Sequence, residues 1–281
     1  MRQLLDPKVD FVFKKIFGNE KHPKILISFL NAVIKPENKI VSVTLKDTEI
    51  TKDNLEDKFS RLDVKAVTSN DEHINIEIQL KNEHNMIRRT LYYWSRMYSE
   101  QLGEGQNYNK LSRTICINIL KFKYLKTEKY HSSYRLKDMQ TNEELTDVQE
   151  LHFIEIPKLP KHMEIKDMLT GWMEFLKDPN SEEVLELEMN VEEIQEAKKE
   201  LIRLSNDEKE RERYERREKA NKDRVSALEK AKSDGEEIGE KKKAIEIAKN
   251  LLKMGLSIDQ VVEASKLSVE EVEEQLKIDK L

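Results

Sequence analysis

Two short stretches of the chain place acidic, basic and amide side chains at strand spacing. Asp63 and Lys65 lie two residues apart, and so do Glu77 and Gln79. Residues two apart in a β-strand project from the same face. Two carboxylates beside an amine and an amide carbonyl are ligands suited to a hard cation. Mg²⁺ binds one or two protein carboxylates and keeps waters for a phosphate substrate.

The segments that carry these residues are predicted to be strands. Residues 61–66 and 75–80 alternate apolar and polar side chains, which is typical of half-buried strands. The polar residues 69–72 between them have the length of a hairpin turn. Antiparallel pairing would bring the four side chains to one surface. The alternative is an ordinary solvent-facing hairpin surface with no chemistry.

The composition limits the classes of protein to consider. The chain has 281 residues, 37% charged and 37% hydrophobic, with a formal net charge of −5. Any binding of nucleic acid must therefore use a local basic patch. A single cysteine, Cys116, excludes an internal disulfide, and its apolar surroundings indicate a core residue. The chain shows no signal-peptide pattern and no apolar run of membrane-spanning length, so we expect a cytoplasmic protein without membrane partners.

The order of predicted elements indicates an α/β domain. Asp6 and Pro7 suit the start of a first helix, which Gly18 ends, and Pro23 starts a second helix. The segments that follow are a strand at 39–45, the hairpin, a basic aromatic helix at 84–102, a buried strand at 114–120, strands at 130–136 and 150–156, and a helix at 165–176. This order favours a mixed β-sheet flanked by helices.

The C-terminal third differs in composition. Residues 206–243 are dense in both basic and acidic residues, and we expect a long exposed helix with too few apolar residues to pack on the body. Residues 244–281 recover apolar stripes, with capping boxes at Ser257 and Ser268. This small helical unit resembles a helix-turn-helix, but its last helix is acidic, which favours assembly or partner docking over DNA recognition. We therefore divide the chain into residues 1–177, 178–243 and 244–281.

The ordered set of motifs resembles the PD-(D/E)XK nuclease superfamily, and within it the Rpn family of recombination-promoting, transposase-like nucleases. The stretches that carry the resemblance are 6–18, 61–65, 75–79, 89–93, 105–108 and 250–257. The resemblance implies a restriction-endonuclease-like α/β fold and Mg²⁺-dependent cleavage of double-stranded DNA, with one or two metal ions. Recombination or defence against mobile DNA is the setting that it implies.

The same resemblance assigns roles to residues. Asp63 would bridge the metal, Glu77 and the carbonyl of Ile78 would be further ligands, and Asp10 on the first helix would complete the site. Gln79 stands where the superfamily motif has lysine. Glutamine can orient a water molecule but supplies no charge. We predict that Lys65 replaces the missing lysine; the alternative is a surface lysine paired with a carboxylate, which contributes little.

Basic residues near these motifs are the expected contacts to the DNA backbone. They are Lys14, Arg88, Arg89 and Arg96. The alternative is that the arginines pair with the many acidic residues of the chain. Three functions remain open at this point: an active endonuclease, a nuclease-fold protein that binds DNA without turnover, and a scaffold that forms homo-oligomers through its C-terminal helices.

Overall fold

The computed structural model describes residues 3–46, 64–82, 84–160 and 165–278. Its centre is a six-stranded mixed sheet with the strand order β1-β2-β3-β4-β6-β5. The strands are β1 (Val43–Lys46), β2 (Val64–Thr68), β3 (His73–Gln79), β4 (Thr114–Leu120), β5 (His131–Lys137) and β6 (Glu144–Glu155). β3, β4 and β6 are parallel, whereas β1–β2, β2–β3 and β5–β6 are antiparallel. The mixed sheet flanked by helices confirms the predicted restriction-endonuclease-like α/β fold.

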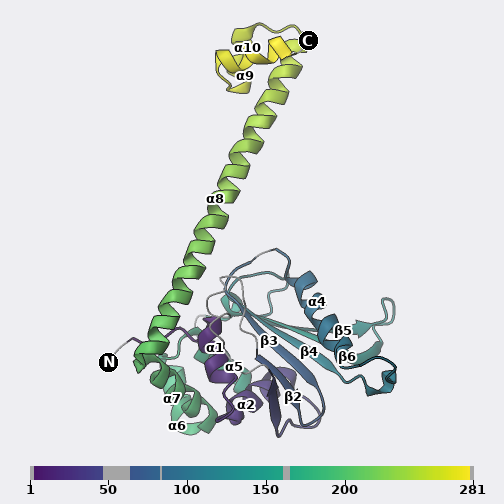
Figure 1. The fold of residues 1–281 in the computed structure, drawn as a ribbon, viewed down its shortest axis with the longest axis vertical. Helices are drawn as coiled ribbons and strands as arrows, with labels where there is room; N and C mark the ends of the chain where they lie inside the picture. The colour runs from purple at the N-terminus through teal and green to yellow at the C-terminus, as the bar shows by residue number, and fades with distance from the viewer. Residues whose placement is uncertain (1–2, 47–63, 83, 161–164, 279–281) are drawn as a thin grey trace. The chain divides into compact units, whose positions relative to one another are not determined.

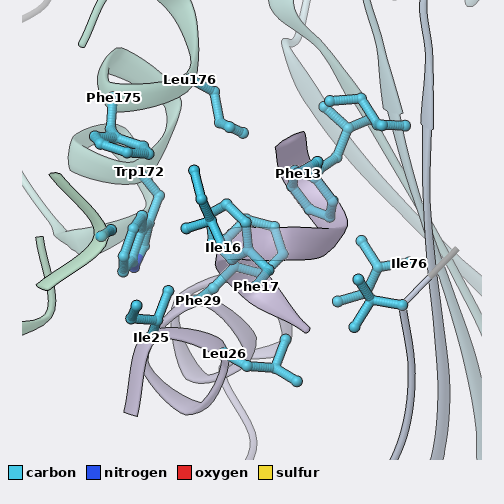
Figure 2. Packing of buried hydrophobic residues seen from close by; sticks show 14 of the residues in the cluster. Phe13, Ile16, Phe17, Ile25, Leu26, Phe29, Ile76, Trp172, Phe175 and Leu176 are labelled. Carbon is cyan, nitrogen blue, oxygen red and sulfur yellow. The ribbon is translucent and has the colours of Figure 1, made fainter. Parts of the chain in front are cut away.

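One face of the sheet is covered by helices from both ends of the domain (Figure 1). They are α1 (Asp10–Phe17), α2 (Pro23–Ile34), α5 (Met168–Lys177), α6 (Glu182–Asn190) and α7 (Glu192–Asn206). Aromatic rings from three of them meet in the core: Phe13 and Phe17 from α1, Phe29 from α2, and Trp172 from α5. Figure 2 shows these rings packed together, with Ile76 of β3 facing them. Their burial joins the helices to the sheet because apolar surface is removed from water.

Local sequence signals explain where several helices begin. Pro23 occupies the first turn of α2, where its missing N–H is not needed. Asp167 accepts a hydrogen bond from the N–H of Thr170 and forms a capping box at the start of α5. The first helix differs from the prediction. Asp6 closes a preceding turn by accepting from the N–H of Lys8, and α1 begins at Asp10.

The opposite face of the sheet is covered by α4 (Met86–Ser99), the basic aromatic helix predicted at 84–102. Met86 packs with Cys116, Leu120, Leu151 and Phe153 in a second, smaller core cluster. Trp94 anchors the helix to the sheet, donating from Nε1 to the carbonyl of Thr114 at 2.9 Å. Figure 1 shows α4 on the other side of the sheet from α1, α2 and α5. Cys116 is 2% exposed, as predicted for a core residue.

The first compact unit comprises Met1–Glu218 and so extends well beyond the predicted boundary at residue 177. Val184 of α6 and Ile194, Ala197, Leu201 and Leu204 of α7 belong to the main core cluster. The long helix α8 (Glu208–Lys253) begins in this unit, where Tyr214 packs against the core. Arg211 donates from Nη2 to the carbonyl of Gln3. The prediction that residues 206–243 are too polar to pack on the body is therefore wrong for the first turns of α8.

The second compact unit, Lys219–Leu281, contains the rest of α8 with α9 (Ile258–Ser265) and α10 (Val269–Ile278). Ala248, Val261, Leu267 and Val272 form its buried cluster. Ser257 and Gln260 form the predicted capping box of α9, and Ser268 with Glu271 caps α10 in the same way. In the part of the chain that the structure describes, no helix has the length and apolarity needed to cross a bilayer.

Candidate functional site

The predicted hairpin forms, and its register places the candidate side chains. β2 and β3 pair antiparallel, with Val64 opposite Ile76 and Lys65 opposite Asn75. Directly opposed residues share a face, and so do residues two apart on one strand. Lys65 therefore lies on the face that carries Asn75, Glu77 and Gln79. Asp63, the other central residue of the prediction, lies outside the described residues.

The polar face of the hairpin is buried rather than solvated. Asn75, Glu77 and Gln79 are 5%, 2% and 3% exposed, whereas Lys65 is exposed. The cause is α4, which packs over this face. Burial of polar groups costs free energy unless they are hydrogen-bonded, so these side chains need partners within the fold. The interpretation of the hairpin as an ordinary solvent-facing surface is therefore wrong for β3.

Glu77 is the best-connected acidic residue of this face. Its Oε1 accepts hydrogen bonds from Gln79 Nε2 at 2.7 Å, Arg89 Nε at 3.1 Å and Arg89 Nη2 at 2.9 Å. The Arg89 guanidinium also stacks on the ring of Tyr93, 4.6 Å from its centroid. A carboxylate this deeply buried needs such a cation and donor. Gln79 and Arg89 thus fix the orientation of Glu77 through its Oε1.

Asp10 is held differently from the prediction. Its Oδ2 accepts from Arg217 Nη2 at 2.6 Å, and its Oδ1 accepts from Arg217 Nε at 3.2 Å and from the N–H of Phe11. The pair is almost fully buried, with Arg217 coming from α8. Both carboxylate oxygens are therefore occupied by a bidentate guanidinium. The contact joins α8 to α1, and the metal-ligand role of Asp10 stays a prediction.

The basic residues predicted to contact DNA occupy different environments. Arg88 is exposed on α4, Arg89 is half-buried on Glu77, and Arg96 is exposed and paired with Glu100 at 2.6 Å. Lys14 is 8% exposed. Buried Lys14 is poorly placed to meet a phosphate backbone, and Arg89 has an acidic partner, as the alternative interpretation of the arginines expected. Arg88 keeps an exposed position suited to phosphate contact.

The motif implies a Mg²⁺ ion held by carboxylate and carbonyl oxygens. Within the described ranges, no three His, Cys, Asp or Glu side chains converge in a way that could hold a metal ion. Glu77 is the one predicted side-chain ligand that the described sheet brings to the polar face; Ile78 follows it in β3, and Asp63 is not described. Oxygen ligands of this kind fit Mg²⁺ chemically. Asp63 and Asp10 remain the predicted ligands that would complete such a site.

A second buried polar cluster spans β5 and β6. His152 Nε2 lies 2.6 Å from Glu150 Oε1, and His131 Nε2 lies 2.9 Å from His152 Nδ1. Arg113 bonds both Glu150 and Glu72. Burial raises the pKa of Glu150, but bonds from His152 and Arg113 outweigh it and hold this pKa at about 2. Burial, followed by the nearby His152 and Lys35, lowers the pKa of His131 to about 4. This cluster joins the residues that precede β3 and β4 to β6 and to the edge strand β5.

Sequence analysis missed residues that the fold brings to these sites. Arg217 stands 207 positions from Asp10, and no local pattern marks it. Asn75 was visible as part of the alternating polar face, but its burial depends on the covering helix α4. Asn118 on β4 is similar: Oδ1 accepts from Thr90, and Nδ2 donates to the carbonyl of His152. Such contacts depend on tertiary packing rather than on spacing.

Comparison with known proteins bears on the same region. The model of a family described as PD-(D/E)XK nuclease family transposase matches residues 7–231. The match includes the hairpin, α4 and the beginning of α8. Neither the curated proteins nor the solved structures give a match to this chain. The family model covers most of the 281 residues and agrees with the mixed α/β sheet. The chain therefore belongs to the PD-(D/E)XK nuclease family transposases.

Proposed function

We propose that the protein is a Mg²⁺-dependent endonuclease that hydrolyses phosphodiester bonds of double-stranded DNA. The observation that carries the proposal is the deeply buried Glu77, held by Gln79 and Arg89 on the polar face of β3. Buried carboxylates are rare unless they are paired or belong to a functional site, and membership of a nuclease family favours a catalytic site here. A cytoplasmic setting and a role in recombination or in defence against mobile DNA are parts of this proposal.

In the proposed mechanism, Glu77, Asp63 and the carbonyl of Ile78 would hold the cation, whether one ion or two is bound. Bound Mg²⁺ lowers the pKa of a coordinated water and stabilises charge on the phosphoryl oxygens. Gln79 stays hydrogen-bonded to Glu77 and orients the attacking water. Lys65, on the same sheet face, supplies the positive charge that Gln79 lacks.

The DNA backbone is proposed to run along the exposed side of α4. Arg88 faces solvent there and carries the fork of donors that suits phosphate. Replacement of Arg88 by Ala should weaken binding to all DNA sequences alike and reduce its salt dependence. Lys137, an exposed basic residue of β5, gives the control Lys137→Ala. An unchanged salt slope in Arg88→Ala would remove Arg88 from the interface.

The decisive experiment is cleavage of supercoiled plasmid by the purified protein with Mg²⁺, Ca²⁺ or EDTA. We expect nicking with Mg²⁺ and none with EDTA. Asp63→Asn and Glu77→Gln should each abolish nicking, with circular dichroism confirming that the variants are folded. Glu104→Gln, at an exposed position after α4, is the control that should cleave normally. Nicking at the original rate by either site variant would reject the assignment.

A second candidate function is DNA binding without turnover. Two observations favour it: Gln79 replaces the motif lysine, and a guanidinium already neutralises Glu77. In that case the plasmid stays supercoiled with every metal, while DNA is retained without Mg²⁺. If the protein neither cleaves nor retains DNA, the result would instead favour a scaffold that forms homo-oligomers through α9 and α10. Size-exclusion chromatography with light scattering measures the oligomeric state.

A further inference from the structure

Three polar side chains form a row across the first three strands of the sheet. Lys46 of β1 lies directly opposite Lys65 of β2, and Lys65 lies directly opposite Asn75 of β3. Directly opposed side chains in an antiparallel pair share a face and lie about 5 Å apart at Cβ. The row therefore brings two ammonium groups and one carboxamide together, two residues along β3 from Glu77.

This row is part of the lining of a pocket of about 300 Å³. The other side is formed by α4, through Tyr93, Arg96 and Met97. This volume is at the small end of pockets that bind small organic ligands. The Arg89 guanidinium that binds Glu77 also stacks on the ring of Tyr93. Tyr93 therefore belongs to both the pocket and the candidate cleavage site.

Asn75 lines this pocket and has a hydrogen-bonding atom without a partner. The residue is 5% exposed, and its Oδ1 is buried without a hydrogen-bond partner. A buried carbonyl oxygen without a donor costs free energy that folding alone gives no reason to retain. The amide of Asn118 on the neighbouring strand shows the contrast, because both its oxygen and its nitrogen are bonded. The geometry at Asn75 indicates a ligand that brings a donor to the carboxamide.

The charges around the pocket select an anion. Lys46 and Lys65 place two basic side chains at opposed positions of the sheet, where one anion can contact both. Arg96 is balanced by Glu100 within the lining. Burial, and then the charge of Lys46, lowers the pKa of His73, so this side chain is neutral at pH 7. Among the lining residues that the structure describes, those at the end formed by β1 and β2 include the basic side chains Lys46 and Lys65.

We propose that this pocket binds one nucleoside 5′-phosphate unit, with its phosphate on Lys46 and Lys65 and its base between Tyr93 and the carboxamide of Asn75. The aromatic ring gives the base a stacking surface, and Asn75 accepts a hydrogen bond from a donor on the base edge. A base inside a duplex cannot present both its face and its edge, so a unit taken from DNA must be unpaired. The same chemistry is present in a free mononucleotide.

The inference deepens the proposed function, because an unpaired nucleotide beside Glu77 would select DNA with a bulge, mismatch or single-stranded end. It does not depend on cleavage for its test. Binding is measured in EDTA on the full chain, by isothermal titration calorimetry and ligand-detected NMR. The probes are deoxyadenosine monophosphate, deoxyadenosine, inorganic phosphate, a fully paired duplex, and the same duplex with one unpaired nucleotide.

We expect the mononucleotide to bind at least about tenfold more tightly than either deoxyadenosine or phosphate alone, because each part makes its own contacts. Asn75→Leu and Lys46→Ala should each weaken this binding about tenfold, whereas Lys137→Ala on β5 should not. Preference for the bulged duplex over the paired one identifies DNA as the source of the nucleotide. Equal binding of the two duplexes, with tight mononucleotide binding, identifies a free nucleotide.

Two results would overturn the inference. One is mononucleotide binding no tighter than that of phosphate, since the base would then make no contact. The other is unchanged binding in both Asn75→Leu and Lys46→Ala, confirmed as folded by circular dichroism. Failure of plasmid cleavage with intact nucleotide binding would count against the proposed nuclease activity alone. Cleavage without nucleotide binding would count against the pocket alone.

Discussion

The guanidinium of Arg89 lies against the carboxylate of Glu77, with Nε 3.1 Å and Nη2 2.9 Å from the same oxygen, Oε1. Arg89 lies in the first turn of α4, the helix that covers this face of the sheet, and Glu77 lies in β3 beneath it. The contact therefore joins α4 to β3 and neutralises the residue that we propose as a metal ligand. Its strength determines how firmly the candidate site is held before any cation binds.

We predict that Arg89→Met destabilises the protein by about 2 kcal/mol, because it leaves the carboxylate of Glu77 buried without its cation. Arg96→Met, on the same helix, removes an exposed pair with Glu100 and should cost less than about 1 kcal/mol. Urea unfolding followed by circular dichroism compares the two. Equal losses would mean that the buried pair contributes no more than the exposed one.

A second prediction concerns the charge that Gln79 lacks. Lys65→Ala should lower kcat for Mg²⁺-dependent nicking about 100-fold, and Gln79→Lys added to it should restore part of the rate. Because Lys65 also lines the nucleotide pocket, the split between kcat and KM is informative. A rise in KM with kcat unchanged would assign Lys65 to phosphate binding. Normal cleavage by Lys65→Ala would show that the metal alone activates the water.

Neighbouring arginines on α8 give a matched pair of variants. Arg217→Met removes a buried bidentate contact with Asp10 and should cost about 3 kcal/mol. Arg216→Met removes an exposed contact with Glu212 and should change stability by less than about 0.5 kcal/mol. Thermal unfolding of the full chain measures both. Similar melting temperatures for the two variants would show that the first turns of α8 do not stabilise the first unit.

Two buried asparagines are predicted to respond in opposite directions. Asn75→Leu removes an oxygen that has no partner and should leave stability unchanged or raise it by about 1 kcal/mol. Asn118→Leu breaks bonds with Thr90 and the carbonyl of His152 and should cost about 2 kcal/mol. Chemical denaturation distinguishes them. A large loss in Asn75→Leu would show that its carboxamide has a structural role rather than a binding role.

The histidine cluster predicts a pH dependence of stability. The folded pKa of His131 is about 4, below its ordinary value of 6.5, so folding favours the neutral ring. The resulting stability is fully present above pH 6.5 and is lost as the pH falls toward 4, by on the order of 2 kcal/mol. Unfolding free energies measured from pH 7 to 4.5 should fall less in His131→Gln. An identical slope in the variant would assign the loss to other groups.

Much of the secondary structure follows from local sequence. Alternation at residues 75–80 predicts β3, and the capping box at Ser257 predicts the start of α9. The apolar run at residues 114–120 predicts a strand buried on both faces, and β4 is buried along its whole length. These signals succeed because period and capping depend on neighbouring residues, whose geometry is fixed within one or two turns of chain.

Tertiary structure decided the environment of each candidate side chain. The sequence placed Glu77 and Gln79 on one face, but only packing of α4 made that face buried and brought Arg89 onto Glu77. The sequence marked Asp10 as a candidate ligand, but only the fold brings the guanidinium of Arg217, 207 positions away, onto its carboxylate. The physical reason is that burial and ion pairing depend on residues distant in the chain, and no spacing rule specifies which of many arginines will reach a given carboxylate.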